Sequence, residues 1–339
     1  MAYHFKNLVF EGGGVKGIAY VGALDVLEKE GILKDIERVA GTSAGAMIAL
    51  LVGLKYTTDE IKEILWDLNF KNFLDSSWGV ARDTNRLLKE YGWYKGDFFR
   101  NLMADFIRRK AGNGEATFRE LEETKKFREI HIVGADLSTG LSKHFNYKDT
   151  PDMKVADAAR ISMSIPLFFA SVKGSDNHVY VDGGLLDNYS IKTFDQLKFI
   201  SDKNNERRTE YYEIINMKTR MKVVEPKEEY VYNKETLGFR LDAKEEIDGY
   251  LKRLNVVRND IKSFFTYTKA LLSTLIDFQN NVHLHSDDWQ RTVYIDTLGV
   301  SAIDFDISDA KKKKLVESGT KYTEAYLEWY NNDEAKANK

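Results

Sequence analysis

The alternation of strand-like and helix-like segments over residues 7–54 constrains the fold of this chain more than any other feature. The run 7–11 is apolar and strand-like, and apolar residues then recur at helical spacing from Ile18 to Ile32. A second short strand-like run ends at Thr42, and an apolar helical segment follows it. This alternation predicts an α/β fold with a central, mostly parallel sheet flanked by helices on both faces.

The turn after the second strand carries the pattern G-x-S-x-G, in Gly41-Thr42-Ser43-Ala44-Gly45. A serine on a sharp strand-to-helix turn of small residues holds its hydroxyl exposed, as a nucleophile requires. Ser43 is therefore the candidate nucleophile. The alternative interpretation is that Ser43 only caps the following helix, because serine is a preferred N-cap residue.

The turn after the first strand is unusually rich in glycine and reads Gly12-Gly13-Gly14-Val15-Lys16-Gly17. Three consecutive glycines leave backbone N–H groups uncovered at a helix N-terminus, where the helix dipole favours negative charge. Such amides are suited to hold the oxyanion of a tetrahedral intermediate in acyl transfer.

The same hexapeptide also matches the dinucleotide-binding pattern G-x-G-x-x-G. That fingerprint requires an acidic residue at the end of the second strand to hold a ribose hydroxyl. Here the second strand runs into Gly41-Thr42-Ser43, so no nicotinamide or flavin cofactor is expected. A P-loop is excluded because Lys16 is followed by glycine and not by serine or threonine.

A serine nucleophile needs a base, and the sequence offers two kinds of candidate. Of the six histidines, His283 and His285 follow a long helical stretch and would suit the order serine, acid, histidine. His131 lies within a strand-like run, where a packed or solvent-facing ring is expected. Asp182 ends the strand-like run 179–181 and would serve as base if burial raised its pKa.

The alternative interpretation of Asp182 is a β-turn, because Asp-Gly is a common turn dipeptide, or a lone metal ligand. Two glycines, Gly183 and Gly184, follow it directly. They allow the backbone to turn away from the carboxylate and leave room beside it.

Taken together, the two glycine-rich turns and Asp182-Gly183-Gly184 resemble the motifs of the patatin-like phospholipase family, in the same order. The segment 158–168 is similar to the family's helix-to-proline segment, so the resemblance covers about the first two hundred residues. It implies a three-layer fold and a Ser–Asp dyad, with Ser43 as nucleophile and Asp182 as base. It also implies that the amides of Gly12–Gly14 are oxyanion donors, with no cofactor and no catalytic metal. Gly184 stands where the family often has alanine.

The function that this resemblance implies is hydrolysis of acyl esters in phospholipids or other acyl lipids, of the phospholipase A or lysophospholipase type. Two alternatives stay open. The same dyad could transfer the acyl group to an alcohol or lipid acceptor, or the chain could bind lipid without hydrolysing it.

Composition bears on the expected partners and location. A net charge of −3 argues against nucleic acid as the main partner. The chain has no cysteine, which is consistent with a reducing cytoplasm, and its start lacks a signal-peptide pattern. No apolar run approaches the roughly eighteen residues of a membrane span. We therefore expect a cytoplasmic protein that meets lipid peripherally, from the aqueous side; the sequence leaves its oligomeric state open.

We expect a catalytic core over residues 1–200 and a C-terminal part, 201–339, that completes the sheet and is otherwise mainly helical. Further strands are predicted at 129–135, 211–217 and 292–296, and helices at 58–68, 243–279 (long and amphipathic) and 308–329. Residues 202–208 are predicted to form an exposed loop.

Two segments have a lipid-binding interpretation beside a simpler structural one. The aromatic and basic residues between Phe70 and Phe99 suit a mobile lid at a membrane surface, or they pack over the sheet. Lys311–Lys314 suits contact with anionic lipid, or it is a solvated run of charge.

Overall fold

A computed structural model describes residues 3–74, 86–222, 229–242 and 287–332, together with 261–262, 266–267, 270–271 and 274. The burial of helix α2 (Ala44–Gly53) follows from its composition, because a helix that is apolar on every side must be buried. All ten of its residues are buried. It packs against the centre of the sheet, which places the elbow before it inside the protein.

The central sheet has eight strands among the described residues. Five run parallel: β1 (Asn7–Phe10), β2 (Arg38–Thr42), β4 (Glu129–Asp136), β11 (Thr236–Asp242) and β12 (Thr292–Asp296). Three others join by antiparallel pairing: β5 (Leu141–Phe145) and β8 (Val179–Asp182) pair with β4, and β7 (Val172–Lys173) pairs with β8. The order is β12-β11-β1-β2-β4-β8-β7, with β5 also paired to β4. The predicted α/β fold with a mostly parallel sheet is thus confirmed.

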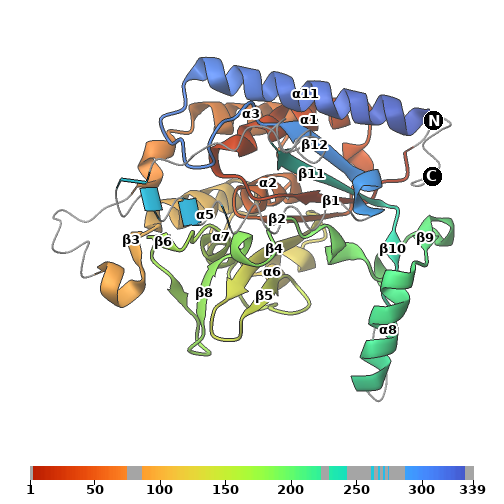
Figure 1. The fold of residues 1–339 in the computed structure, drawn as a ribbon, viewed down its shortest axis with the longest axis horizontal. Coiled ribbons are helices and arrows are strands. Elements are labelled where there is room, and N and C mark those ends of the chain that lie inside the picture. Colours follow the sequence, from red (N-terminus) through yellow and green to blue (C-terminus); the bar gives the residue numbers. More distant parts are fainter. Residues whose placement is uncertain are drawn as a thin grey trace.

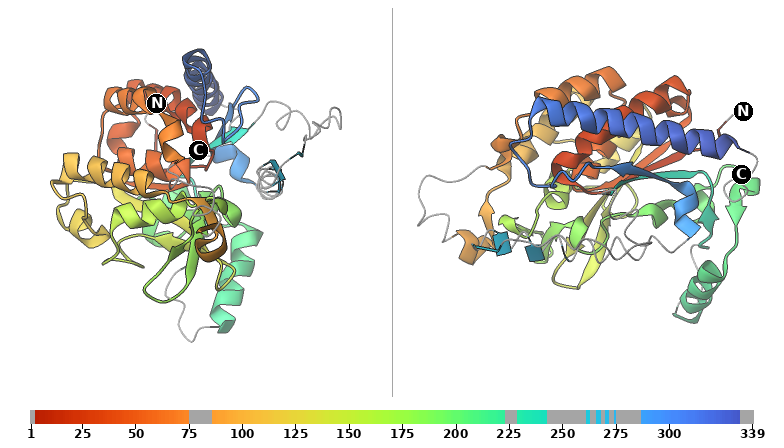
Figure 2. Two further views of the ribbon diagram at one scale, coloured as in Figure 1. Left: turned by 90° about the vertical axis from the view of Figure 1, so that its left-hand side faces the viewer. Right: turned by 45° about the horizontal axis from the view of Figure 1, so that its top comes forward.

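The α-helices named next cover one face of this sheet, and the short 3-10 helices of the segment 189–199 lie on the other, so helices flank the sheet as predicted. Figure 1 shows α11 (Asp309–Asn331) lying along α1 (Ala19–Lys29), and the second view in Figure 2 shows the same neighbours. Helix α7 (Val155–Ser162) packs on β4 and β8, and α5 (Asp97–Ala111) packs on α7. Further α-helices are α3 (Thr58–Asp67), α6 (Phe118–Glu123) and α8 (Glu210–Lys222). Two small strand pairs lie outside the central sheet: β3 (Gly92–Tyr94) with β6 (Leu167–Phe169), and β9 (Glu206–Arg207) with β10 (Tyr232–Asn233).

A separate, smaller apolar cluster covers the other side of β1 and β2. There Val9 and Ala40 meet side chains of the segment 189–199, which continues from the strand that ends in Asp182. This segment forms two short 3-10 helices, at Ile191–Phe194 and Leu197–Phe199. The chain following Asp182 is therefore held against the central strands.

The strand predicted at 211–217 is wrong, because these residues belong to α8. Their aromatic and β-branched side chains favour a strand, but the helix is fixed by polar groups four residues apart on one face. Tyr212 donates to Asp195, and Asn216 exchanges hydrogen bonds with the backbone of Tyr230 at 2.8 Å each. Tertiary hydrogen bonding outweighs the local strand preference here. Figure 1 shows α8 projecting from the body of the protein.

The other predicted helices and strands are found where they are described. Helix α3 begins with a capping box between Thr57 and Glu60, and α11 is capped by Ser308. Strands β4 and β12 match the predictions at 129–135 and 292–296. Residues 202–208 contain a 3-10 turn and the short strand β9. Most of the helix predicted at 243–279 lies outside the described residues.

The aromatic segment and the lysine run are partly structural. Phe70, Phe73 and Phe99 are buried, and the Phe73 ring lies 5.7 Å from that of Phe99. Residues 75–85, which include Trp78 and Arg82, lie outside the described residues. Lys312 is buried and donates to the carbonyl of Trp66 at 2.7 Å. These buried residues stabilise the fold, so the lid hypothesis rests on the other aromatic and basic residues between Phe70 and Phe99.

A fully buried ion-pair network joins the segment 189–199, which follows β8, to the 3-10 helix Asp287–Arg291 just before β12. The Arg291 guanidinium donates to both carboxylate oxygens of Asp195, at 2.6 and 2.7 Å, and to Asp288 at 2.7 Å. Its side chain is 0% exposed. Removing one partner of such a network leaves uncompensated charge in the interior.

We expect Arg291→Met to lower the free energy of unfolding by about 3–5 kcal/mol, measured by urea denaturation. The matched control is Arg208→Met. Arg208 pairs with Glu229 at 2.7 Å, but its side chain is 55% exposed. That change should cost less than about 1 kcal/mol. Equal losses in the two variants would contradict the importance of the buried network.

Candidate active site

Ser43 occupies the strained turn that the sequence predicts. It lies between β2 and α2 with φ 53° and ψ −124°, a backbone conformation that residues other than glycine rarely adopt. Its side chain makes no capping hydrogen bond to α2, so the interpretation as a helix cap has no support here. Strain of this kind persists only where the surrounding structure imposes it, and it concentrates at functional sites.

The small residues around Ser43 are required by close approach of the backbone. A Cβ on Gly41 would lie 2.1 Å from the carbonyl oxygen of Gly45. A Cβ on Gly12 would lie 3.1 Å from the Cβ of Ser43 and 2.4 Å from Oδ1 of Asn188. The glycine-rich loop and the elbow are therefore in contact, although thirty residues separate them in the sequence.

Asp182 ends β8, and the residue is buried, with 4% of its surface exposed. Oδ1 accepts a hydrogen bond from the amide of Gly184 at 2.7 Å. Oδ2 is buried and has no hydrogen-bond partner among the described residues. Burial raises the pKa of Asp182 to about 7, against the opposing effects of the Gly184 amide and the Ser43 hydroxyl. A carboxyl with this pKa can accept and return a proton near neutral pH.

The end of α7 and the residues that follow it hold both Ser43 and Asp182. The backbone N–H of Ser43 donates to Oγ of Ser162 at 2.9 Å, and Ser162 donates to the carbonyl of Val133 at 2.6 Å. The amide of Asp182 donates to the carbonyl of Ser164 at 2.9 Å. The Ser43 hydroxyl lies 3.6 Å from the sulfur of Met163. This segment brings the two residues together from distant parts of the chain.

Asn188 connects the glycine-rich loop to the turn after Asp182. Its side-chain amide donates to the carbonyl of Gly12 at 3.2 Å and to Glu11 at 3.1 Å. Its own carbonyl accepts the Gly12 amide at 3.1 Å. The Gly12 amide is thus engaged, whereas the amides of Gly13 and Gly14 have no acceptor within the described part of the chain.

The other residues of the predicted motifs support these groups. Thr42 donates its hydroxyl to the carbonyl of Asp187 at 3.0 Å. Gly14 begins a 3-10 helix, Gly14–Ile18, that contains Lys16 and Gly17. A Cβ on Gly17 would lie 3.3 Å from that of Ala44, and a Cβ on Gly183 would lie 2.4 Å from the carbonyl oxygen of Val133. Burial raises the pKa of Glu11 to about 7, and the positive charge of Lys16 is among the effects that oppose this rise.

Sequence reasoning did not identify Ser162 or Asn188. Ser162 lies in the segment 158–168 that carries the family resemblance, but nothing in the pattern indicates a hydrogen bond to Ser43. Asn188 follows Asp182 by six residues, beyond the Asp-Gly-Gly motif. His283 and His285 lie outside the described residues. His131 is buried, which agrees with the packed ring rather than the solvent-facing ring expected from the sequence. It pairs with Glu129 at 2.8 Å.

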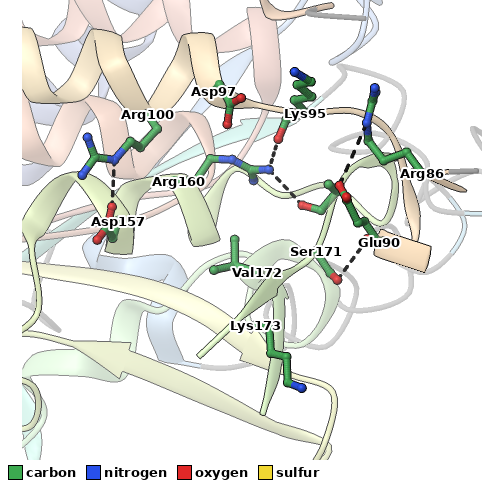
Figure 3. A pocket seen from close by; sticks show the side chains of 11 residues that line it. Arg86, Glu90, Lys95, Asp97, Arg100, Asp157, Arg160, Ser171, Val172 and Lys173 are labelled. Carbon is green, nitrogen blue, oxygen red and sulfur yellow. Dashed lines mark hydrogen bonds and ion pairs between the residues drawn. The ribbon is translucent and has the colours of Figure 1, made fainter. Parts of the chain in front are cut away.

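A charged pocket of about 660 Å³ lies on another side of α7 (Figure 3). Its lining residues, which do not include Ser43 or Asp182, are Arg86, Glu90, Lys95, Asp97, Arg100, Asp157, Arg160, Ala170, Ser171, Val172 and Lys173. Arg160 donates to the carbonyl of Ala170 at 2.9 Å and also to Ser164. Arg160 therefore braces the segment that holds Asp182.

Two features are absent from the described residues. No helix there is long and apolar enough to cross a membrane. No group of three or more histidine, aspartate or glutamate side chains there is arranged to hold a metal ion.

Comparison with known proteins defines the class. The family model for patatin-like phospholipases matches residues 8–195. The protein YqhO of Bacillus subtilis is 29% identical over 334 residues, covering 94% of this chain and 97% of that protein. A cGAMP-activated phospholipase of Pseudomonas aeruginosa is 26% identical over 212 residues, 57% of each chain. The crystal structure of VipD from Legionella pneumophila shares the fold, with a TM-score of 0.58, 16% identity, and coverage of 97% of this chain and 67% of that one.

These matches define a lipid hydrolase as the class of protein. The chain belongs to the patatin-like phospholipase family, because the family model matches more than half of it and contains both Ser43 and Asp182.

Proposed function

We propose that the protein hydrolyses fatty-acyl esters of phospholipids through a Ser43–Asp182 dyad, as a phospholipase A or lysophospholipase. The observation that carries this proposal is the strained Ser43 beside a buried carboxyl whose pKa is raised to about 7. Oδ2 of Asp182 has no other partner among the described residues and is suited to accept the serine proton. Catalytic hydrogen bonds are often long before substrate binds, so the contact from Ser43 to Met163 does not conflict with this role.

In the proposed reaction, the Ser43 oxygen attacks the ester carbonyl while Asp182 takes the hydroxyl proton. The amides of Gly13 and Gly14 donate to the oxyanion, since the Gly12 amide is engaged by Asn188. The carbonyl re-forms, the C–O bond to the lysolipid breaks, and Asp182 returns the proton to the leaving alcohol oxygen. Asp182 then takes a proton from a water molecule as the water oxygen attacks the acyl-enzyme carbonyl. The bond to the Ser43 oxygen breaks, Asp182 returns the proton to that oxygen, and the fatty acid leaves.

Fatty-acid release from mixed phospholipid vesicles, with the lysolipid identified, tests this function. Release would show hydrolysis, and the lysolipid would show which ester is cut. Added alcohol acceptors separate hydrolysis from the alternative of acyl transfer, because transfer would yield a new ester in place of free fatty acid. Vesicle binding without either product would favour the lipid-binding alternative.

The dyad requires neither a metal ion nor a histidine. We expect turnover to persist in EDTA and in the double variant His283→Ala/His285→Ala, within about threefold of the untreated wild type. The measurement is initial rate of fatty-acid release. A loss of about a thousandfold in the histidine variant would instead indicate a conventional triad.

Ser162 is proposed to position the nucleophile through its hydrogen bond to the Ser43 amide. Ser162→Ala leaves that buried N–H without its acceptor, which costs about 1–3 kcal/mol, and we expect kcat to fall about ten- to hundredfold. The matched control is Ser318→Ala, which removes another buried serine hydrogen bond, to the carbonyl of Asp296 at 2.6 Å. If both variants lose the same activity, Ser162 has only a structural role.

A further inference from the structure

Glu11 is the last residue before the glycine-rich loop, and the proposed reaction uses none of its atoms. It follows β1 directly, and the residue is 1% exposed. Carboxyl groups are rarely buried so completely unless their oxygens are engaged. Here both oxygens accept hydrogen bonds, Oε2 from the backbone amide of Leu241 at 2.7 Å and Oε1 from the side-chain amide of Asn188 at 3.1 Å.

A buried cation lies beside the Glu11 carboxyl. Nε of Arg240 is 3.8 Å from Oε1 of Glu11, and the Arg240 side chain is 0% exposed. Arg240 also pairs with Asp242 at 2.8 Å. Burial raises the pKa of Glu11 to about 7; Arg240 opposes this rise and Asp242 adds to it. Above that pH the carboxyl is ionised, and it can then only accept hydrogen bonds.

The ionised Glu11 fixes which end of the Asn188 carboxamide faces the glycine-rich loop. The Asn188 amide nitrogen donates to Glu11 and also to the carbonyl of Gly12, at 3.2 Å. Both partners are acceptors, so a carboxamide turned by 180° would place its oxygen against two other oxygens. A Cβ on Gly12 would lie 2.4 Å from Oδ1 of Asn188, and a Cβ on Gly184 would lie 3.0 Å from it. The carboxamide therefore lies closely between the loop and the turn that follows Asp182.

The second hydrogen bond of Glu11 holds the residue on the other side of the loop. Leu241 belongs to β11, the strand that pairs with β1. A Cβ on Gly13 would lie 2.5 Å from Cδ1 of Leu241, so this side chain lies directly against Gly13. The start of the loop is thus confined between Asn188 and Leu241, and the Glu11 carboxyl is bonded to both.

We propose that Glu11 is a positioning residue for the oxyanion donors. Through Asn188 it holds the Gly12 peptide in place, and with it the direction of the Gly13 and Gly14 amides that follow. This inference rests on the proposed function, because it takes those amides as the donors to the oxyanion. Donors that are slightly misplaced weaken binding of the transition state and leave binding of the substrate unchanged. Loss of this role should therefore lower kcat and not raise KM.

Glu11→Gln tests this role, because glutamine has the same shape. Its carbonyl oxygen can still accept from Leu241, but its NH₂ group then faces the Asn188 amide, donor against donor. At pH 8.5, above the pKa of Glu11, we expect kcat for fatty-acid release to fall about tenfold, with KM within about twofold of wild type. Asn188→Ala should lower kcat about a hundredfold.

The double variant Glu11→Gln/Asn188→Ala shows whether the two residues act as one unit. We expect it to lose no more activity than Asn188→Ala alone, because the Glu11 contact acts through Asn188. Losses that multiply to about a thousandfold would contradict action through Asn188.

The matched control is Glu235→Gln. Glu235 is equally buried, at 1% exposed, and its carboxyl likewise accepts backbone and asparagine amides, those of Ser201, Asp202 and Asn205, at 2.9 Å each. It lies at the other end of β1, where its backbone carbonyl accepts the first amide of that strand. Melting temperatures establish that both variants fold. The control should keep kcat within about threefold of wild type. An equal loss of kcat in both variants would leave Glu11 only a structural role and overturn the proposal.

Labelling by a fluorophosphonate separates failure of this proposal from failure of the proposed function. The Ser43 oxygen attacks phosphorus, the phosphorus–fluorine bond breaks, fluoride leaves, and Asp182 takes the hydroxyl proton. The phosphoryl oxygen takes the place of the oxyanion, so labelling needs the positioned amides but no phospholipid. We expect Glu11→Gln to be labelled about tenfold more slowly than wild type or Glu235→Gln, measured by mass spectrometry.

Each contrary result has its own meaning. Labelling of Glu11→Gln at the wild-type rate would overturn the positioning role alone. Slow labelling of Glu11→Gln, when the wild type is labelled rapidly but releases no fatty acid, would support the positioning role and overturn only the phospholipid substrate. A wild type that is neither labelled nor active would overturn both the dyad and this inference.

Discussion

Ser43→Ala is expected to abolish fatty-acid release, with kcat reduced by at least about 10⁴-fold. The alanine keeps the Cβ and the backbone of the elbow but removes the only atom proposed to attack the ester. The measurement is lysolipid and fatty-acid formation from mixed vesicles over a long incubation. Binding to vesicles should be unchanged, because Ser43 is a buried residue, 4% exposed, and is not a surface contact.

The melting temperature of Ser43→Ala serves as the control for folding. Ser43 forms no capping hydrogen bond, and its hydroxyl lies 3.6 Å from the Met163 sulfur, so little stability depends on that oxygen. A folded Ser43→Ala variant that still released fatty acid at a tenth of the wild-type rate would exclude Ser43 as nucleophile. The proposed dyad would then be wrong.

Asp182→Asn is expected to lower kcat about 10³- to 10⁴-fold, since an amide of the same shape cannot take the Ser43 proton. The amide oxygen can still accept from Gly184, so the turn is preserved. The matched control is Asp136→Asn, a change at a buried carboxyl two residues beyond Gly134, the β4 partner of Asp182. The control should keep activity within about fivefold of wild type. Comparable losses in both variants would contradict a specific role for Asp182 as base.

The raised pKa of Asp182 predicts how wild-type activity depends on pH. The base must be ionised, so kcat/KM should fall about tenfold for each pH unit below the pKa of about 7 and level off above it. A pH–rate profile from pH 5 to 9 measures this. Activity that stays constant down to pH 5 would show that no group with this pKa is required.

The same shift has an opposite consequence for stability. Because the carboxyl pKa rises from 3.8 in the unfolded chain to about 7 in the fold, the folded state binds the proton more tightly. Stability therefore decreases as pH rises from about 4 to about 7, where the unfolded chain is ionised and the fold still holds the proton. Asp182→Asn, which carries no charge, should accordingly melt no lower than wild type at pH 8.

Part of the candidate site could be predicted from local sequence because its chemistry depends on local geometry. A strand followed by Gly-x-Ser-x-Gly produces the elbow at Ser43 wherever the strand lies, and a glycine run after β1 leaves amides exposed. Helices α1, α2 and α3 and the parallel strands β1, β2 and β4 follow from the same periodicity, whereas α5 and α6 were not predicted. The family resemblance then identified Asp182, which local pattern alone left as one of several interpretations.

The run 211–217 shows why other predictions failed. Its composition favours a strand, but Tyr212 and Asn216 reach Asp195 and Tyr230, which are far enough away in sequence that no local window includes them. The hydrogen bonds of an α-helix place these two side chains on one face, and the buried Asp195 network outweighs local propensity.

The sequence by itself determined the fold class, the strained elbow at Ser43 and the exposed amides of the glycine-rich loop, because each follows from residues adjacent in the chain. Only the tertiary structure decided which amides remain open, what holds the Ser43 backbone, and how far burial raises the pKa of Asp182. Those properties depend on Asn188 and Ser162, which are brought from distant segments, and on the desolvation that packing creates. Desolvation and long-range hydrogen bonds exist only once the chain is folded.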